Sequence, residues 1–404
     1  MTLFFVVFLN IFSSQAKVEA LAGGGILDEK GAGVFELGFD VVDKSLSLGI
    51  SLPFAFNHEG GFYKSMWDEG SDFGSAIRYL SWYRKSEELR AAVRIGNEND
   101  ITIGTGALVK NLTLTSELFR NHSALRIYFE NTHFRLNGFV NDFVEPRFGG
   151  GDLTFLFTDY LSAGTSFFLD TQAVLHISDP MGITQVDTKL RKIIPWETGN
   201  LVGTSVFLTY KPASWFSATA QAVSFDPSDI RGWGGVFSAD FRYTREKWKL
   251  DFKLRGAAGG SGFTYAPVDQ FYLVRNFYLN MASGNSLLSG LKNKTMTSAG
   301  GSADFTASYG NKMTVSGGIR TAGGNHVFHL SSLIFVKKGF QLSFYSAFSD
   351  EENFIFALES RLKVSRSFFV FLRGARQYTV IGHQPVFQTS TMAFAGIGGN
   401  YRLE

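Results

Sequence analysis

Few side chains in this sequence have the types and spacing that catalysis or metal binding requires. His326 and His329 are three residues apart, which on a strand places them on opposite faces, so we expect no shared metal ion. The pair His122-Ser123 joins a base to a hydroxyl, but no glycine-rich oxyanion turn follows it. Residues 104–106 (Gly-Thr-Gly) lack the third glycine and the helix of a phosphate-binding loop, and they predict a turn or a strand kink. We therefore expect no catalytic site, no metal, no cofactor and no enzyme activity.

Charged side chains instead recur at alternate positions within otherwise apolar segments. Asp240 with Arg242 and Lys249 with Asp251 are examples, and a water-filled interior would hydrate such groups at low cost. The sequence predicts that they line a polar lumen, and their mixed signs predict a weak ion preference. The predicted lining residues are Arg78, Arg94, Arg126, Glu130, Asp240, Arg242, Lys249, Asp251, Lys253, Arg255, Glu359 and Arg361.

The composition is that of a chain not wholly surrounded by water. Of 404 residues, 45% are apolar and only 18% charged, which is below the usual quarter, and the formal charge is +2. The 42 phenylalanines favour strands and pack well against acyl chains. Basic residues form no single patch, so nucleic-acid binding is not expected. The absence of cysteine excludes a lipoprotein anchor, a thiolate metal site and disulfides.

Strict alternation of apolar and polar residues is the dominant pattern along the chain. Residues 35–41, 46–54 and 247–255 alternate in this way, and residues 303–372 continue it with short polar breaks. We count about 18 strands, with 16 to 20 compatible, and residues 89–108 and 269–280 remain ambiguous. Strands of about ten residues are the length that a tilted strand needs to cross an apolar band of about 25 Å.

The expected fold is all-β: a closed antiparallel transmembrane β-barrel with short turns at one end and longer loops at the other. A soluble all-β sandwich is the alternative, because it too would place charged side chains in water. Apolar faces recur on about eighteen segments with no helices to cover them, and this favours lipid contact. Beyond residue 30 no run of 18 apolar residues predicts a membrane-spanning helix.

The start of the chain has the pattern of an export signal. Residues 3–12 form a short apolar core, and small residues follow at Ser14, Ala16, Ala20 and Ala22. We expect a signal peptide over residues 1–22 and a single barrel domain over 23–404, with residues 23–33 as a flexible lead-in. Residues 142–152 predict a loop. Residues 179–200 form either an exposed loop or an inward-folded constriction.

The last residues carry a resemblance to a known class of proteins. Gly398, Tyr401 and Leu403 are spaced as in the C-terminal signal of outer-membrane barrels that the barrel assembly machinery reads, although Glu404 departs from the usual aromatic ending. With the signal-like start and the alternating strands, the chain resembles a bacterial outer-membrane porin. The resemblance implies location in the cell outer membrane after signal cleavage. The implied partners are outer-membrane lipid, the assembly machinery and small solutes, and the oligomeric state stays open.

Three functions remain compatible with this architecture. The first is a porin-like channel that passes small solutes through a polar lumen. The second is a plugged barrel that transports hydrophobic compounds, for which Phe207 and Tyr345 on the polar face give slight support. The third is a non-conducting surface barrel whose loops bind a partner.

Overall fold

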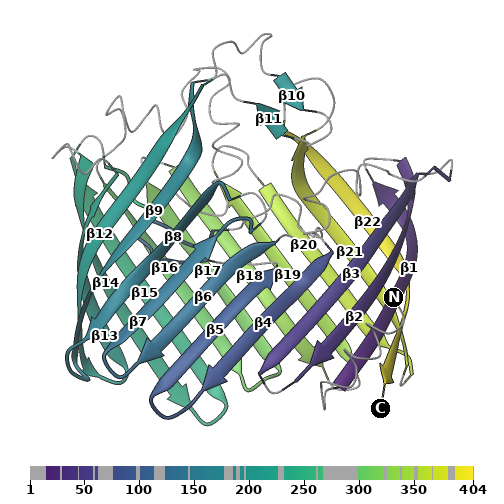
Figure 1. The fold of residues 1–404 in the computed structure, drawn as a ribbon, viewed down its shortest axis with the longest axis horizontal. Helices are drawn as coiled ribbons and strands as arrows, with labels where there is room; N and C mark the ends of the chain where they lie inside the picture. Colours follow the sequence, from purple (N-terminus) through teal and green to yellow (C-terminus); the bar gives the residue numbers. More distant parts are fainter. Residues whose placement is uncertain are drawn as a thin grey trace.

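A computed structural model describes most of the strands and part of their connections. The described residues are 15–27, 30–43, 45–57, 60–61, 76–96, 101–112, 123–143, 146–176, 185–187, 192–194, 197–225, 232–260, 263–266, 299–322, 325–336, 339–349, 354–365, 367–380 and 387–403. Within them the chain forms one 20-stranded sheet and one small hairpin, β10–β11 (Figure 1).

The first half of the sheet is formed by β1 (Gln15–Leu27), β2 (Lys30–Val42), β3 (Leu46–Asn57), β4 (Ile77–Lys85), β5 (Leu89–Gly96), β6 (Ala124–Asn131), β7 (Phe134–Val140), β8 (Phe148–Leu156), β9 (Leu161–His176) and β12 (Glu197–Ala213). The second half is formed by β13 (Phe216–Ser224), β14 (Trp233–Arg245), β15 (Trp248–Gly259), β16 (Ala299–Tyr309), β17 (Met313–Ala322), β18 (Asn325–Val336), β19 (Phe340–Ser349), β20 (Phe354–Lys363), β21 (Phe368–Val380) and β22 (Phe387–Leu403). The separate hairpin consists of β10 (Gln185–Asp187) and β11 (Lys192–Ile194).

The sheet closes on itself. Each strand pairs antiparallel with its sequence neighbour, β9 pairs with β12, and β1 pairs with β22 from Ala16↔Leu403 to Leu27↔Met392. Closure gives every strand two neighbours, so the wall has no unpaired edge. The expected closed antiparallel all-β barrel is therefore confirmed, with the architecture that the resemblance to porins implied.

The strand count differs from the expected value of about 18. The sheet has 20 strands, and one of them is β1, which includes residues 23–27 of the expected flexible lead-in. Three consecutive glycines in this strand, residues 23–25, have no side chains that could show an alternating pattern in the sequence. At Gly25 a side chain would collide with the backbone of Ala393, so this glycine permits close strand approach. Residues 148–151 were likewise expected in a loop, but they begin β8.

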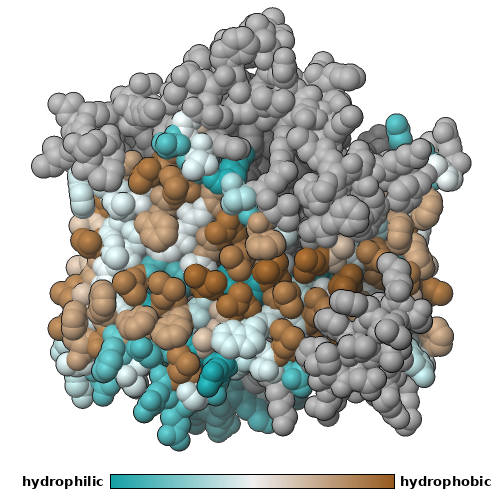
Figure 2. Space-filling view, viewed as in Figure 1, coloured by the Kyte–Doolittle hydropathy of each residue, from teal (hydrophilic) through white to brown (hydrophobic). Residues whose placement is uncertain are grey.

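The outer wall of the barrel is apolar. Figure 2 shows a band of brown, hydrophobic side chains across the wall, with teal, hydrophilic side chains gathered along its lower edge. Large outward residues are more than half exposed: Phe167 at 56%, Val206 at 56%, Phe237 at 58% and Ile397 at 63%. A band of this kind on a closed sheet suits contact with acyl chains.

The seam between the two ends of the chain has its own small core on the inner side. Leu21, Phe369 and Phe371 are buried together and pack against Phe394. Gly398 provides the space, because a Cβ there would lie 2.6 Å from Leu21 Cδ2 and even closer to the Phe369 ring. The Phe369 ring of β21 therefore lies over Gly398 of β22, and the Phe371 ring lies next to Gly23 of β1.

Replacing Gly398 with alanine is expected to destabilise the barrel by about 1–3 kcal/mol, because the added methyl group overpacks the seam. Urea-induced unfolding of the full chain refolded in detergent, followed by tryptophan fluorescence, measures the effect. Gly399→Ala is the matched control, since a Cβ at Gly399 makes only ordinary contacts, the nearest 3.7 Å from Ser367 O. Equal losses of stability in the two variants would contradict this role for Gly398.

Candidate functional site: the barrel interior

Residues 101–112 fold into the barrel between β5 and β6. Ile101 and Leu112 form an antiparallel bridge, and the Gly106 N–H donates to Ile103 O at 3.0 Å. Gly104 and Gly106 have φ angles of +57° and +87°, which glycine adopts without strain. Of the turn and the strand kink that the sequence left open at residues 104–106, the structure has the turn. Residues 101–108, left open as part of a strand, belong to this inward-folded segment.

This inward segment is held by an apolar core inside the wall. Leu108 and Val109 are fully buried, and they belong to one cluster with Phe148, Phe168 and Val236. These three wall residues lie on β8, β9 and β14, so the segment packs across a broad stretch of the inner face. The sequence placed a candidate constriction at residues 179–200 instead. Of the described part of that range, β10–β11 lies beyond the upper rim in Figure 1, and residues 197–200 begin β12.

The turn of the inward segment makes polar contacts with the wall. Thr105 Oγ1 donates to Gln221 Oε1, and Gln221 Nε2 donates to Ser205 Oγ at 2.6 Å. The Gly104 N–H donates to Asp152 Oδ2 at 3.1 Å. Hydrogen bonds therefore fix the turn in addition to its burial. The acceptors are the neutral amide oxygen of Gln221 and one carboxylate oxygen of Asp152.

A buried ion cluster fixes the other side of the segment. Lys110 Nζ lies 2.8 Å from Asp304 Oδ2, and Arg255 Nη1 donates to the same oxygen at 2.7 Å. The Lys110 and Arg255 side chains are only 4% and 6% exposed. Burial lowers the pKa of the Lys110 ammonium to about 8, and Asp304 opposes this shift. Lys110 therefore remains mostly protonated at neutral pH, with one carboxylate shared between two cations.

A second short segment, residues 263–266, packs beside the first. The Ala266 N–H donates to Ala107 O at 2.9 Å, and the Arg320 guanidinium donates to Ala266 O. The hydroxyls of Tyr265 and Ser302 are hydrogen-bonded at 2.9 Å. Two chain segments therefore fill part of the interior together, and Arg320 anchors the second to the wall.

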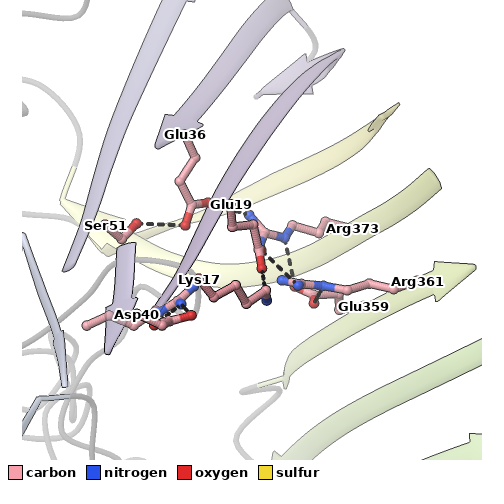
Figure 3. Close-up of polar contacts among 9 residues, drawn as sticks. Lys17, Glu19, Glu36, Asp40, Ser51, Glu359, Arg361 and Arg373 are labelled. Atoms are coloured by element: carbon pink, nitrogen blue, oxygen red, sulfur yellow. Dashed lines mark hydrogen bonds and ion pairs between the residues drawn. The ribbon is translucent and has the colours of Figure 1, made fainter. Parts of the chain in front are cut away.

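A separate charged network spans the seam on the inner face (Figure 3). Glu19 of β1 accepts from Lys17 at 2.7 Å and from Arg361 of β20 at 3.0 Å. Arg373 of β21 donates to Glu36 of β2 at 3.1 Å and, at 2.7 Å, to Glu359, which also pairs with Arg361. The network therefore connects the first two strands to β20 and β21 across β22.

The seam network continues to β3 and β4 and is balanced in charge. Arg78 donates to both oxygens of Asp40 at 2.5 Å, Tyr79 donates to Asp40 at 3.0 Å, and Ser51 donates to Glu36 at 2.6 Å. Its four cations, which are Lys17, Arg78, Arg361 and Arg373, meet four carboxylates, which are Glu19, Glu36, Asp40 and Glu359. A neutral and mutually paired network of this kind is suited to closing the wall rather than to binding an ion.

The predicted lumen-lining residues fall into several groups. Arg78, Glu359 and Arg361 join the seam network, and Arg255 joins the Lys110 cluster. Arg94 and Arg126 are register partners on β5 and β6, while Glu130 accepts from Tyr128 and lies 3.5 Å from Arg90. The remaining five lie along β14 and β15: Asp240, Arg242, Lys249, Asp251 and Lys253.

Cross-strand register places Asp240, Lys253 and Asp304 in one row on three adjacent strands. Asp304 contacts the inward segment through Lys110, so this row faces the interior. Arg242 and Asp251 form an ion pair at 2.7 Å, with the Arg242 side chain 64% exposed. The row toward the hairpin turns is therefore open to solvent, whereas the row beside the inward segment is enclosed.

Sequence reasoning missed several members of both clusters. Asp304, Arg320 and Arg373 follow the same alternation as the predicted residues, so the parity of β16, β17 and β21 could have identified them. Glu19 lay within the segment assigned to the signal peptide, and Lys110 lay outside any alternating segment. No local sequence pattern predicts that the segment around Lys110 folds into the barrel.

His326 and His329 both lie on β18, with register partners Thr321 and Gly318 on β17. Strand alternation places them on opposite faces, as predicted. Nδ2 of Asn111, a residue whose φ is +53°, lies 3.0 Å from His329 Nε2. Among the described residues no group of three His, Cys, Asp or Glu side chains could hold a metal, and no helix is long and apolar enough to span a membrane. His122 and residues 269–280 lie outside the described residues.

A cavity opens beside the inward segment, with a volume of about 470 Å³. Its lining combines the inward segment with the inner faces of β15 to β20. Charged and polar lining residues are Thr102, Lys110, Asn111, Lys253, Arg255, Asp304, Thr306, Ser316, His329, Ser331 and Tyr345. This is the polar space in the described interior where a solute can contact both the wall and the inward segment.

Comparison with known proteins gives only distant similarity. No family model and no curated protein matches the chain. Among solved structures, Pseudomonas aeruginosa OccK5 (OpdH) has a TM-score of 0.38 at 8% identity, covering 97% of this chain and 98% of that one. Pseudomonas aeruginosa OpdL has a TM-score of 0.38 at 9% identity with the same coverage. Wzi, an outer-membrane protein of Escherichia coli, has a TM-score of 0.36 at 10% identity, covering 100% and 87%. The barrel assignment therefore rests on this chain's own strand pairing.

Replacing Asp304 with asparagine is expected to loosen residues 101–112, because it leaves Lys110 and Arg255 buried without their shared counter-charge. Breaking a buried ion pair in this way costs roughly 3 kcal/mol. Hydrogen exchange of the 101–112 amides in detergent, read by mass spectrometry, measures the change.

Asp251→Asn is the matched control for Asp304→Asn, since it breaks the exposed pair with Arg242 and should change exchange by less than about 1 kcal/mol. A double variant Asp304→Asn with Lys110→Met should restore part of the protection. Unchanged exchange in Asp304→Asn would show that the Lys110–Asp304–Arg255 cluster does not hold the segment.

Proposed function

We propose that the protein is a porin-like channel of a bacterial outer membrane that passes small solutes through a polar lumen narrowed by residues 101–112. The main support for a channel is that a closed 20-stranded wall is apolar on its outside and has rows of charged side chains on its inner face. A barrel of this size is too wide for its wall side chains to fill, so the interior either conducts or is plugged. Here the enclosed core occupies the side of β7 to β15, while the cavity beside it is polar.

The plugged barrel for hydrophobic compounds is the weaker candidate. Phe207 is buried with its ring near Gly104 of the inward segment, and Tyr345 lines the polar cavity, so these two residues do not together line an apolar pocket. The apolar residues of the inward segment are sealed against the wall. We propose no enzymatic role for the interior.

The orientation and partners follow the same proposal. Connections of two residues join β6 to β7, β12 to β13 and β14 to β15, all at the edge opposite β10–β11 in Figure 1. Short turns are typical of the periplasmic side, which would place β10–β11 outside the cell. Outer-membrane lipid would contact the apolar band. The assembly machinery would read the last strand, where Tyr401 is outward and 66% exposed.

Ion conductance tests the channel. The full chain, refolded in detergent as a heat-modifiable β-rich species, is expected to give stepwise currents in planar bilayers. Leu108→Asp places a charge in the apolar core of the inward segment and should raise single-channel conductance by releasing it. Leu108→Met keeps an apolar side chain of similar volume and should leave conductance unchanged. A folded protein that gives no current in any of these forms would refute the channel.

We also propose that export removes residues up to Ala16, and not up to Ala22 as expected from the sequence. Cleavage after Ala22 would delete Glu19, which is almost fully buried and pairs with Lys17 and Arg361. Ser14-Gln15-Ala16 has the small-x-small pattern of a cleavage site. Mass spectrometry of the protein purified from membranes should find Lys17 as the first residue. Gly23 as the first residue would contradict the proposal.

A further inference from the structure

The cavity beside residues 101–112 has an excess of positive charge. Lys110, Lys253 and Arg255 line it, and Asp304 is the single acidic residue among the described lining residues. Charged neighbours of the lining do not change this excess. Asp240, the register partner of Lys253, adds one negative charge, and Arg320, two strands from Arg255 in the same row, adds one positive charge. With or without Asp240 and Arg320 in the count, the region has two more positive than negative side chains, whereas the seam network is neutral.

Donor groups in this cavity lack acceptors. One oxygen, Asp304 Oδ2, accepts from Arg255 and forms the ion pair with Lys110. Arg255 Nε is buried and has no hydrogen-bond partner, and Lys110 Nζ has the ion pair but no hydrogen bond of good geometry. The second carboxylate oxygen, Asp304 Oδ1, is also buried without a hydrogen-bond partner, so it satisfies neither donor. Lys253 makes no ion pair with any residue that the structure describes. Buried cationic donors without acceptors are costly, and an anionic ligand group would satisfy them.

Hydroxyl groups form the remaining polar lining. Cross-strand register places Thr306, Ser316, Ser331 and Tyr345 in one row across β16 to β19. Each can donate and accept, as the hydroxyl groups of a polyol require. The row lies one register step from Asp304, so a ligand held at the cations would extend along it. A volume of about 470 Å³ is within the range of small-molecule sites.

We propose that this cavity binds a small solute carrying an anionic group, either carboxylate or phosphate, together with several hydroxyl groups, as in a sugar acid or a sugar phosphate. The anionic group contacts Lys253 and the exposed edges of Lys110 and Arg255, while the hydroxyl groups face the Thr306–Tyr345 row. This inference rests on the proposed channel function and names the solute class that its interior selects.

Calorimetric titration of the full chain in detergent tests the proposal without requiring conductance. Sodium gluconate and glucose 6-phosphate are the anionic probes, distinguishing carboxylate from phosphate, and glucose is the neutral probe. At least one anionic probe should bind at least about fivefold more tightly than glucose, because a charge-assisted contact to a partly buried cation is added. The preference should weaken at high salt.

Lys253→Gln should reduce binding of the preferred anion by about fivefold, since it removes one cation from the lining without disturbing the Lys110–Asp304 pair. Lys249→Gln is the matched control, because Lys249 is exposed, lies on the same face of β15 four residues before Lys253, and does not line the cavity. Thr306→Val should weaken both the anionic probes and glucose.

Equal binding of glucose and the anions, equal effects of the two lysine variants, or no binding of any probe would overturn the proposal. Folded protein that binds gluconate but gives no current would refute the channel while leaving this site in place. Stepwise current without selective binding of an anionic probe would support the channel and refute this binding site.

Discussion

The requirement that every backbone polar group be paired where the wall faces an apolar surrounding determines this structure. A sheet satisfies it only by closing, and closure here depends on pairing β1 with β22 along twelve register positions from Ala16↔Leu403 to Leu27↔Met392. The two strands come from opposite ends of the described chain, so their pairing joins the segments of the wall that are most distant in sequence. The seam is accordingly reinforced on its inner side by the aromatic cluster around Phe369 and by ion pairs from β20 and β21.

Closure of the sheet also creates an interior space, which other segments of the chain partly fill. Twenty strands enclose more space than wall side chains can occupy. Residues 101–112 and 263–266 fill part of it with an apolar core of their own, and they meet the wall through Thr105, Lys110 and Ala266. The lumen is thus asymmetric: one side is packed and sealed, and the other retains a polar cavity.

The two charged clusters of the interior differ in a way that separates structure from function. At the seam, four cations and four carboxylates satisfy one another, and the network bridges strands that must stay together. Beside the inward segment, Asp304 is the one carboxylate of the described cavity lining, and it is shared by Lys110 and Arg255. The surplus of positive charge there suits a ligand that carries an anionic group.

Strand alternation in the sequence determined the fold class and which side of each strand is polar, because side chains two residues apart share a face whatever the distant contacts are. Asp240, Lys253 and Arg255 could be assigned to the interior on that basis. The strand count was low because glycines at 23–25 and 149–151 carry no side chain to alternate, although they suit strands packed closely against their neighbours. Only the tertiary structure decided that Lys110 meets Asp304, nearly two hundred residues away, and that Glu19 meets Arg361. Such pairings depend on strand register around a closed wall and on a loop turning inward, and neither is encoded in local sequence.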